Sequence, residues 1–153
     1  MVSIDSKVAN FSLPATGDTE ISLKDFKGKR LVLYFYPKDN TPGCTLEGQD
    51  FRDLHAEFRA AGAEILGVSR DSVKVHEGFK SKQGFTFDLL SDAEEALCRQ
   101  FDVIHEKNMY GRKVMGVVRS TFLIDEAGIL RKEWRKVRVK GHAAEVLEAV
   151  KAL

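Results

Sequence analysis

The sequence predicts an α/β fold in which helices flank a central mixed sheet. Strand-like and helix-like segments alternate along most of the chain. Residues 31–36 form a nearly continuous apolar run, typical of a strand that is buried on both faces. A hairpin pattern and then an amphipathic helix follow towards the end. A length of 153 residues suits one domain, which we expect to span residues 1–153.

The elements are expected in a definite order. In the first two thirds of the chain they are strands at 11–13, 19–23 and 31–36, a helix over 41–60, a strand at 63–69, a helix over 71–82, a strand at 85–87 and a helix over 92–101. Residues 102–118 contain Gly111 and Gly116 and are expected to form a loop that could be mobile. Strands at 120–125 and 129–134 then pair as a hairpin, and 141–153 form the last helix. The parallel strands should be joined by right-handed crossovers.

Composition excludes several classes of protein. Hydrophobic residues make up 43% and charged residues 31%, which is globular and argues against a disordered, collagen-like or coiled-coil chain. A net charge of +1 is poor support for nucleic-acid binding. The locally basic segment 131–140 is interpreted as a solvated strand and loop, with Val137 and Val139 alternating inward. No apolar stretch is long enough to span a membrane, and the first residues lack a secretory signal, so we expect a cytoplasmic protein.

The two cysteines, Cys44 and Cys98, are too far apart in sequence to form a Cys-x-x-Cys pair. The histidines are scattered along the chain at positions 55, 76, 105 and 142. This pattern suggests no metal site, and no sequence feature implies an organic cofactor. We expect His76 and His142 to be helix-surface or capping residues rather than general bases. Each cysteine is therefore either a small buried side chain or a reactive thiol.

The sequence around Cys44 is typical of a helix start. Thr41 suits the N-cap, where its hydroxyl would accept a backbone N–H, and Pro42 suits the first helical position. Cys44 then falls in the first turn, close to free N–H groups and to the positive end of the helix dipole. Both favour the thiolate, which is the nucleophilic form of cysteine. The helix also begins just beyond the carboxyl end of a buried strand, where α/β sheets bind ligands.

Simpler interpretations of this segment remain open. Cys44 could be only a small buried residue near a helix start. Thr41 could be only a cap, although capping and catalysis are compatible for a hydroxyl. Pro37 could simply end the strand, and in that position it would also shield a thiolate from bulk water.

The motif Pro37-x-x-x-Thr41-x-x-Cys44 resembles the active-site signature of peroxiredoxins. The longer string from Tyr34 to Glu47 is similar to the bacterioferritin comigratory protein (PrxQ) branch, as are residues 67–71, 89–92 and 119–125. The resemblance spans nearly the whole chain. It implies a thioredoxin-like fold with an N-terminal β extension, and a thiol-dependent peroxidase that serves antioxidant defence and redox homeostasis.

The resemblance also implies roles for individual residues. Cys44 would be the peroxidatic cysteine, whose thiolate attacks hydrogen peroxide or an organic hydroperoxide and becomes a sulfenic acid. Thr41 would hydrogen-bond the peroxide, and the Arg119 guanidinium would stabilise the developing negative charge. The N–H groups of Gly43 and Cys44 would complete the anion site. Glu47 could orient Arg119 or help cap the first turn.

The sequence departs from the family pattern in its second thiol. Many members carry a resolving cysteine five residues after the peroxidatic one, where this chain has Gln49, and others carry it near the position of Lys80. Cys98 is the only other thiol, and its neighbours Leu97 and Phe101 indicate a core-facing helix. We therefore expect a one-cysteine cycle in which an external thiol resolves Cys44. Candidate reductants are thioredoxin, or glutaredoxin with glutathione.

Two other functions remain open at this stage. One is a thiol–disulfide oxidoreductase or glutathione-handling protein on the same fold, although the chain lacks a Cys-x-x-Cys pair. The other is a redox sensor or holdase-like protein that uses Cys44 only as a switch. The resemblance suggests a monomer.

Overall fold

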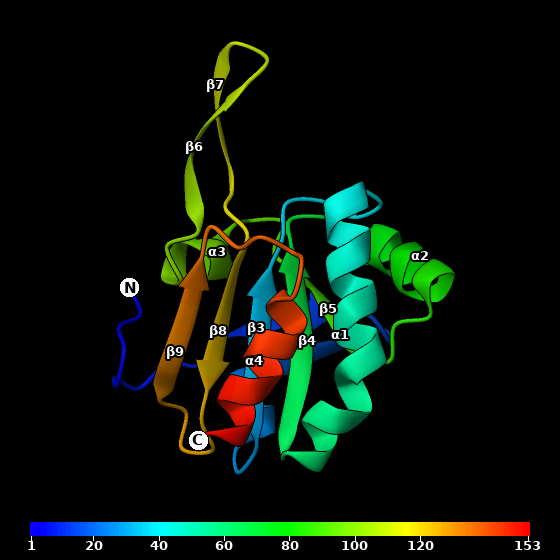
Figure 1. Cartoon of the computed structure of the whole chain (residues 1–153). Coiled ribbons are helices and arrows are strands. Elements are labelled where there is room, and N and C mark those ends of the chain that lie inside the picture. The colour runs from blue at the N-terminus through cyan, green and yellow to red at the C-terminus, as the bar shows by residue number, and fades with distance from the viewer.

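A computed structural model describes all 153 residues of the chain (Figure 1). A seven-stranded sheet, ordered β2-β1-β5-β4-β3-β8-β9, forms its centre. These strands are β1 (Ser12–Ala15), β2 (Thr19–Ser22), β3 (Arg30–Phe35), β4 (Ala63–Ser69), β5 (Asp88–Ser91), β8 (Ser120–Ile124) and β9 (Leu130–Arg135). The helices are the 3₁₀ helix η1 (Leu23–Phe26), α1 (Pro42–Ala60), α2 (Val73–Gln83), α3 (Ala96–Gln100) and α4 (His142–Lys151). None of the helices combines the length and the hydrophobicity that a membrane span requires.

The sheet is mixed, as the sequence predicts. β3, β4 and β5 are parallel to one another, whereas β8 pairs antiparallel with β3, and β9 with β8. β1 and β2 form an antiparallel pair that joins the sheet through the single register pair Ala15↔Leu90. This pair is the expected N-terminal β extension. The mixed sheet flanked by helices, with this extension, is the architecture that the resemblance implies.

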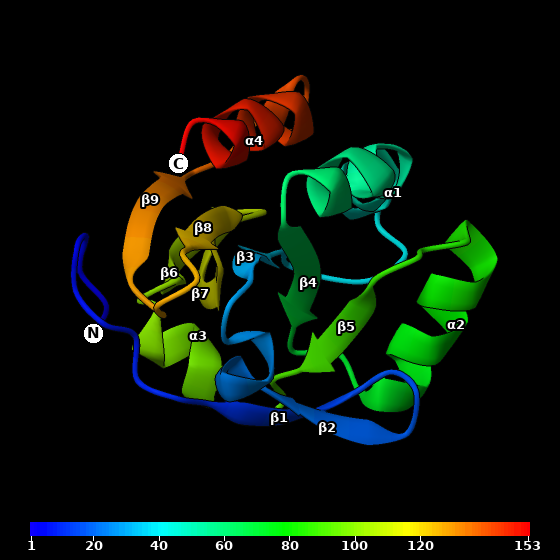
Figure 2. The ribbon, with the colours of Figure 1, turned by 90° about the horizontal axis from the view of Figure 1, so that it is seen from below.

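The central strand β3 supplies side chains to two separate cores. Because successive side chains of a strand point to opposite faces, its apolar run fills both sides of the sheet. One core lies on the side of α3 and the N-terminal segment, and the other lies under α1, α2 and α4 (Figure 2). Residues Leu31, Leu33 and Phe35 belong to the first core, and Val32, Tyr34 and Tyr36 belong to the second.

Two predicted elements are wrong in their bounds. Phe85 and Phe87 are buried and stack at a centroid distance of 5.2 Å, but strand pairing begins only at Asp88. The apolar alternation at 85–87 therefore reflects packing rather than a ladder. The helix predicted over 92–101 is confined to α3, because the Asp92 carboxylate accepts the backbone N–H groups of Leu97 and Cys98 and so caps a later start.

The predicted loop 102–118 is largely an antiparallel hairpin, which corrects the expectation. β6 (Ile104–Met109) and β7 (Arg112–Val117) pair along their whole length and project away from the main sheet (Figure 1). Most of their side chains are exposed, so the sequence lacks the apolar alternation that marks a half-buried strand. Tyr110 and Gly111 form the tip, both with positive φ.

Candidate active site

Cys44 lies where the sequence places it, in the first turn of α1. β3 ends at Phe35, the chain turns through residues 36–41 (hereafter the active-site loop), and α1 begins at Pro42. Proline at the first helical position is confirmed. Pro37 lies half-buried in this loop. Cys44 itself is only 2% exposed, so its sulfur belongs to the α1 side of the core rather than to the open surface.

Thr41 occupies the N-cap position, but the predicted capping bond is wrong. Its hydroxyl accepts no backbone N–H of α1; it donates instead to the carbonyl oxygen of Lys38 at 2.7 Å. This bond closes the active-site loop on itself. Because the hydroxyl proton is engaged, the oxygen lone pairs remain available to accept a hydrogen bond from a ligand.

Arg119 is brought to Cys44 by the register of the sheet. Residue 119 directly precedes β8, and Ser120 at the start of β8 pairs with Phe35 at the end of β3. Arg119 therefore lies beside the end of β3, just before α1, and its Nη2 lies 3.5 Å from the Cys44 sulfur. The backbone carbonyl of Arg119 accepts the N–H of Val137 at 3.0 Å, which fixes the chain at this point.

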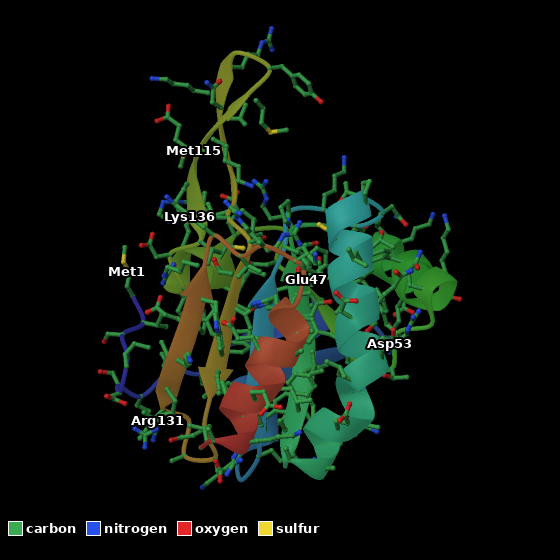
Figure 3. The ribbon with its side chains drawn as sticks, viewed as in Figure 1. Met1, Glu47, Asp53, Met115, Arg131 and Lys136 are labelled. Carbon is green, nitrogen blue, oxygen red and sulfur yellow. The ribbon has the colours of Figure 1, made fainter.

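Glu47 lies on the other side of the same guanidinium. Its Oε1 accepts a hydrogen bond from Arg119 Nη1 at 2.6 Å, so the two ends of the arginine fork contact the carboxylate and the sulfur. Figure 3 shows Glu47 on helix α1. Because Glu47 follows Cys44 by three residues, about one helical turn, the two side chains lie on the same face of α1. The contact expected between Glu47 and Arg119 is present.

This cluster places a carboxyl, a guanidinium and a thiol close together in a largely buried site, and burial affects the pKa of the first two. Burial raises the pKa of Glu47 from 4.5 to about 7, and the nearby Arg119 only partly opposes this. Burial disfavours the charge on Arg119, but Glu47 and Cys44 outweigh it and raise the pKa of Arg119. The second carboxylate oxygen of Glu47, Oε2, is the only buried side-chain nitrogen or oxygen in the protein without a hydrogen-bond partner.

The backbone supplies two further donors beside the sulfur. The N–H groups of Gly43 and Cys44 have no acceptor within the protein, because they belong to the first turn of α1. Gly43 also makes room for the arginine: a Cβ at this position would lie 3.1 Å from Arg119 Nη2. The guanidinium contact with the sulfur and the two free N–H groups in the first turn of α1 together place positive charge at this helix end, where an anionic ligand would be stabilised.

Cys98 lies on the opposite side of the sheet from Cys44. It is 0% exposed, and it packs in the core formed with α3, whereas Cys44 packs in the core beneath α1. The expectation that Cys98 faces the core is confirmed. Burial, together with the Asp92 carboxylate, raises the pKa of the Cys98 thiol well above its usual range. Both effects disfavour the thiolate.

Two histidine predictions are wrong. His76 is completely buried rather than on a helix surface, and its ring contacts Asp39 and the carbonyl of Leu90. His142 starts α4 but is also buried, with its Nε2 2.8 Å from the Thr121 hydroxyl. Burial lowers the pKa of His142 to about 4. No local sequence pattern marks either contact, because the partners lie in other elements.

Lys107 is a charged residue that the sequence analysis did not connect with the site. It lies midway along β6, opposite Val114 of β7, and its side chain packs against Gly116. Burial and the charges of Arg119 and Arg70 lower its pKa, while Cys44 opposes this shift. The hairpin thus brings a further cation within electrostatic range of Arg119 and Cys44, from a segment in which no motif marks it.

Comparison with known proteins identifies the chain. The model of the AhpC/TSA family matches residues 4–133, and Cys44, Glu47 and Arg119 all lie within the matched region. The chain belongs to the AhpC/TSA family. A Xanthomonas campestris relative, Peroxiredoxin Bcp, is 58% identical over 97% of this chain and 94% of its own length. The chain is accordingly a peroxiredoxin of the Bcp/PrxQ branch.

Solved structures agree with this assignment of the peroxiredoxin. The bacterioferritin comigratory protein of Xanthomonas campestris, studied for alkyl peroxide reduction, superposes with a TM-score of 0.89 at 58% identity, covering 93% of this chain and 90% of that one. A cysteine-to-serine mutant of Xylella fastidiosa PrxQ superposes with a TM-score of 0.94 at 49% identity, covering 99% and 97%. The sequence resemblance to this branch is confirmed.

Proposed function

We propose that this peroxiredoxin reduces hydrogen peroxide and organic hydroperoxides through a sulfenic acid at Cys44, and that an external thiol completes the cycle. The relative from Xanthomonas campestris, which is studied for alkyl peroxide reduction, supports the inclusion of organic hydroperoxides. The contact of Arg119 with both Cys44 and Glu47 supports the roles proposed for the individual side chains.

In the oxidative step the Cys44 thiolate attacks the terminal oxygen of the hydroperoxide. A sulfur–oxygen bond forms, the oxygen–oxygen bond breaks, and the remaining alkoxide or hydroxide takes a proton from water. The Thr41 hydroxyl accepts a hydrogen bond from the peroxide. Arg119 and the free N–H groups of Gly43 and Cys44 stabilise negative charge as it moves from sulfur to oxygen. Glu47 holds the guanidinium in the orientation that this requires.

In the reductive step one thiol attacks the sulfenic acid, releases water and forms a mixed disulfide with Cys44. A second thiol then displaces the Cys44 thiolate and leaves as a disulfide with the first. Thioredoxin, or glutaredoxin with glutathione, supplies such thiols. The cycle requires one chain only, and a monomer remains our prediction.

The separation of Cys44 and Cys98 is the observation that best supports the proposed one-cysteine cycle. A disulfide requires Cα atoms within about 7 Å, and here the central sheet stands between the two thiols. Cys98 is also 0% exposed and poorly ionised. The resemblance would place a resolving cysteine at position 49 or near position 80, and this chain has Gln49 at the first and Lys80 at the second, with no cysteine at either.

Steady-state consumption of hydrogen peroxide with a thiol reductant tests this proposal. We expect Cys44→Ser to have no turnover above the uncatalysed rate. Cys98→Ser is the matched control, because it removes the other buried thiol, and we expect it to keep the turnover of the unsubstituted protein. Loss of turnover in Cys98→Ser, with the protein still folded, would contradict the one-cysteine cycle. Turnover retained in Cys44→Ser would contradict the proposed function altogether.

A further inference from the structure

A second buried polar cluster lies directly behind the active-site loop. Asp39, in that loop, is 3% exposed, and His76, on α2, is 0% exposed. The Asp39 carboxylate accepts the Tyr36 hydroxyl at 2.6 Å through Oδ1, and its Oδ2 lies 2.6 Å from His76 Nδ1. The other ring nitrogen of His76 lies 2.9 Å from the carbonyl oxygen of Leu90 in β5.

The partners of His76 fix the number of protons in this cluster. The Leu90 carbonyl only accepts hydrogen bonds, so His76 Nε2 must donate. A neutral imidazole has no second N–H, so the contact with Asp39 is a hydrogen bond only if a further proton lies between Nδ1 and Oδ2. That proton lies either on the ring, which makes an ion pair, or on the carboxyl. In both cases Asp39 and His76 share it, and the buried pair has no net charge.

Asp39 is also held through its backbone. Its N–H donates to Asp71 Oδ2 at 2.9 Å, and the same carboxylate accepts the hydroxyl of Ser69. The next residue, Asn40, has a φ of +64°, a conformation that requires support from its surroundings in a non-glycine residue. Thr41 and the first turn of α1 follow at once. One residue of the active-site loop therefore connects α2 and the end of β4 to the segment that carries Cys44.

The cluster has few of the features of a metal site. Asp39, Asp71 and His76 offer potential ligand atoms within 4.8 Å of one another. However, the facing atoms already have hydrogen-bond partners within the protein. This arrangement favours a hydrogen-bonded anchor.

We propose that the buried Asp39–His76 pair is a positioning device for peroxide reduction, which holds the active-site loop so that Thr41 and Cys44 keep their reactive arrangement. Neither residue touches the Cys44 sulfur, so the pair acts through the loop. The inference rests on the proposed function of Cys44. A small displacement of reacting groups is enough to slow an enzyme strongly, so the loss of this anchor should be visible in the rate of the oxidative step.

Two substitutions of Asp39 distinguish the effect of its hydrogen bonds from the effect of filling the same space. In Asp39→Asn the amide can accept the Tyr36 hydroxyl and donate to a neutral His76, so every contact is preserved. Asp39→Leu removes all of these contacts. The measurement is the rate constant for oxidation of Cys44 by hydrogen peroxide in a single turnover without reductant. We expect Asp39→Leu to be slower by about tenfold or more, and Asp39→Asn to remain within about threefold of the unsubstituted protein.

A pair of histidine variants controls for general destabilisation. His55 is buried on α1, with hydrogen bonds to Thr86 and Glu64 at the far side from the active-site loop. We expect His76→Gln to slow the oxidation of Cys44, and His55→Gln to leave its rate unchanged, whatever both substitutions do to the melting temperature. Equal slowing in the two variants would overturn the proposal. So would a wild-type rate in folded Asp39→Leu, and if that variant does not fold, the histidine pair decides.

Hydrogen exchange provides a readout that does not need activity. We expect His76→Gln to increase amide exchange selectively at Asp39 and Thr45, whose N–H groups donate to Asp71 and to the Thr41 carbonyl, while amides of β3 and β4 keep their protection. Unchanged exchange at Asp39 and Thr45 would contradict the proposal. If the unsubstituted protein does not oxidise Cys44 at all, the proposed function is wrong. The hydrogen-exchange comparison still decides whether the Asp39–His76 pair holds the active-site loop.

Discussion

At the scale of single residues, the site depends on one arginine with two partners. The guanidinium of Arg119 presents its donors in a fixed plane, so it can contact the Glu47 carboxylate and the Cys44 sulfur at the same time. A lysine has the same charge but a single ammonium group, and it cannot reproduce both contacts. Charge alone is therefore insufficient to explain the arrangement.

Substitution of Arg119 by lysine tests this. We expect Arg119→Lys to lower the rate constant for Cys44 oxidation about 100-fold, because directed donors to the reacting atoms are lost. Stopped-flow measurement with hydrogen peroxide gives this rate constant. Arg131→Lys is the control, since Arg131 is an exposed arginine paired with Asp5 and Asp125 away from the site. If Arg119→Lys reacts as fast as Arg131→Lys, the paired guanidinium contacts with Glu47 and Cys44 are not needed for oxidation of Cys44.

The buried carboxyl of Glu47 predicts a dependence of stability on pH. Its pKa is raised by burial to about 7 in the folded protein, against 4.5 for the reference carboxyl. The folded protein therefore binds a proton more tightly than the unfolded chain does, and this contribution to stability is present at low pH and lost as pH rises towards about 7.

Comparison with Glu47→Gln isolates this contribution. The difference in free energy of unfolding, unsubstituted protein minus variant, should fall between pH 4.5 and pH 7 and then level off. Each pKa unit corresponds to about 1.4 kcal/mol, so the fall is on the order of 3 kcal/mol. Urea unfolding across this range measures it. A difference that grows with pH would mean that attraction to Arg119 outweighs burial.

At the scale of elements, helix α1 is positioned by a glycine contact. A Cβ at Gly48 would lie 2.2 Å from Cζ of Phe85, so the helix approaches the aromatic core closely at this point. Gly78 is its counterpart in α2, where a Cβ would meet nothing within 4 Å. Both glycines lower helix propensity equally, but only Gly78 has room for a side chain.

Alanine at the two positions should have opposite effects. We expect Gly78→Ala to stabilise the protein by about 0.5–1 kcal/mol, because alanine is the better helix former. Gly48→Ala should destabilise it by about 1–3 kcal/mol, since overpacking against Phe85 exceeds the same gain. Urea unfolding of both variants measures the effects. Stabilisation by Gly48→Ala would show that Phe85 can move aside at little cost.

The elements differ in how far the sequence could predict them. β3 and α1 follow from an apolar run and a Thr-Pro start, which are local signals that the structure reproduces. The β6–β7 hairpin could not be predicted in this way, because exposed strands carry no apolar alternation. The helix predicted over 92–101 is longer than α3, because the side chain of Asp92 caps the helix at a later residue.

At the scale of the whole molecule, the sheet separates two cores, and Cys44 and Cys98 belong to different ones. Local motifs place Cys44 at the start of α1, and family resemblance points to Arg119, but the sequence alone shows no contact between residues 75 positions apart. The same holds for Asp39 and His76, which are 37 positions apart. Their burial arises from the packing of α2 on the sheet, so a surface histidine was the natural expectation. The side of the sheet on which Cys98 packs is likewise a property of the assembled fold.

In the proposed cycle, Cys44 alone takes up one oxygen atom of the peroxide and holds it as a sulfenic acid until an external thiol reacts with it. Intact mass spectrometry after one equivalent of hydrogen peroxide, without reductant, tests this most directly. We expect the addition of one oxygen atom, located at Cys44 and absent in Cys44→Ser. A loss of two hydrogen atoms, with a peptide linking Cys44 to Cys98, would contradict it.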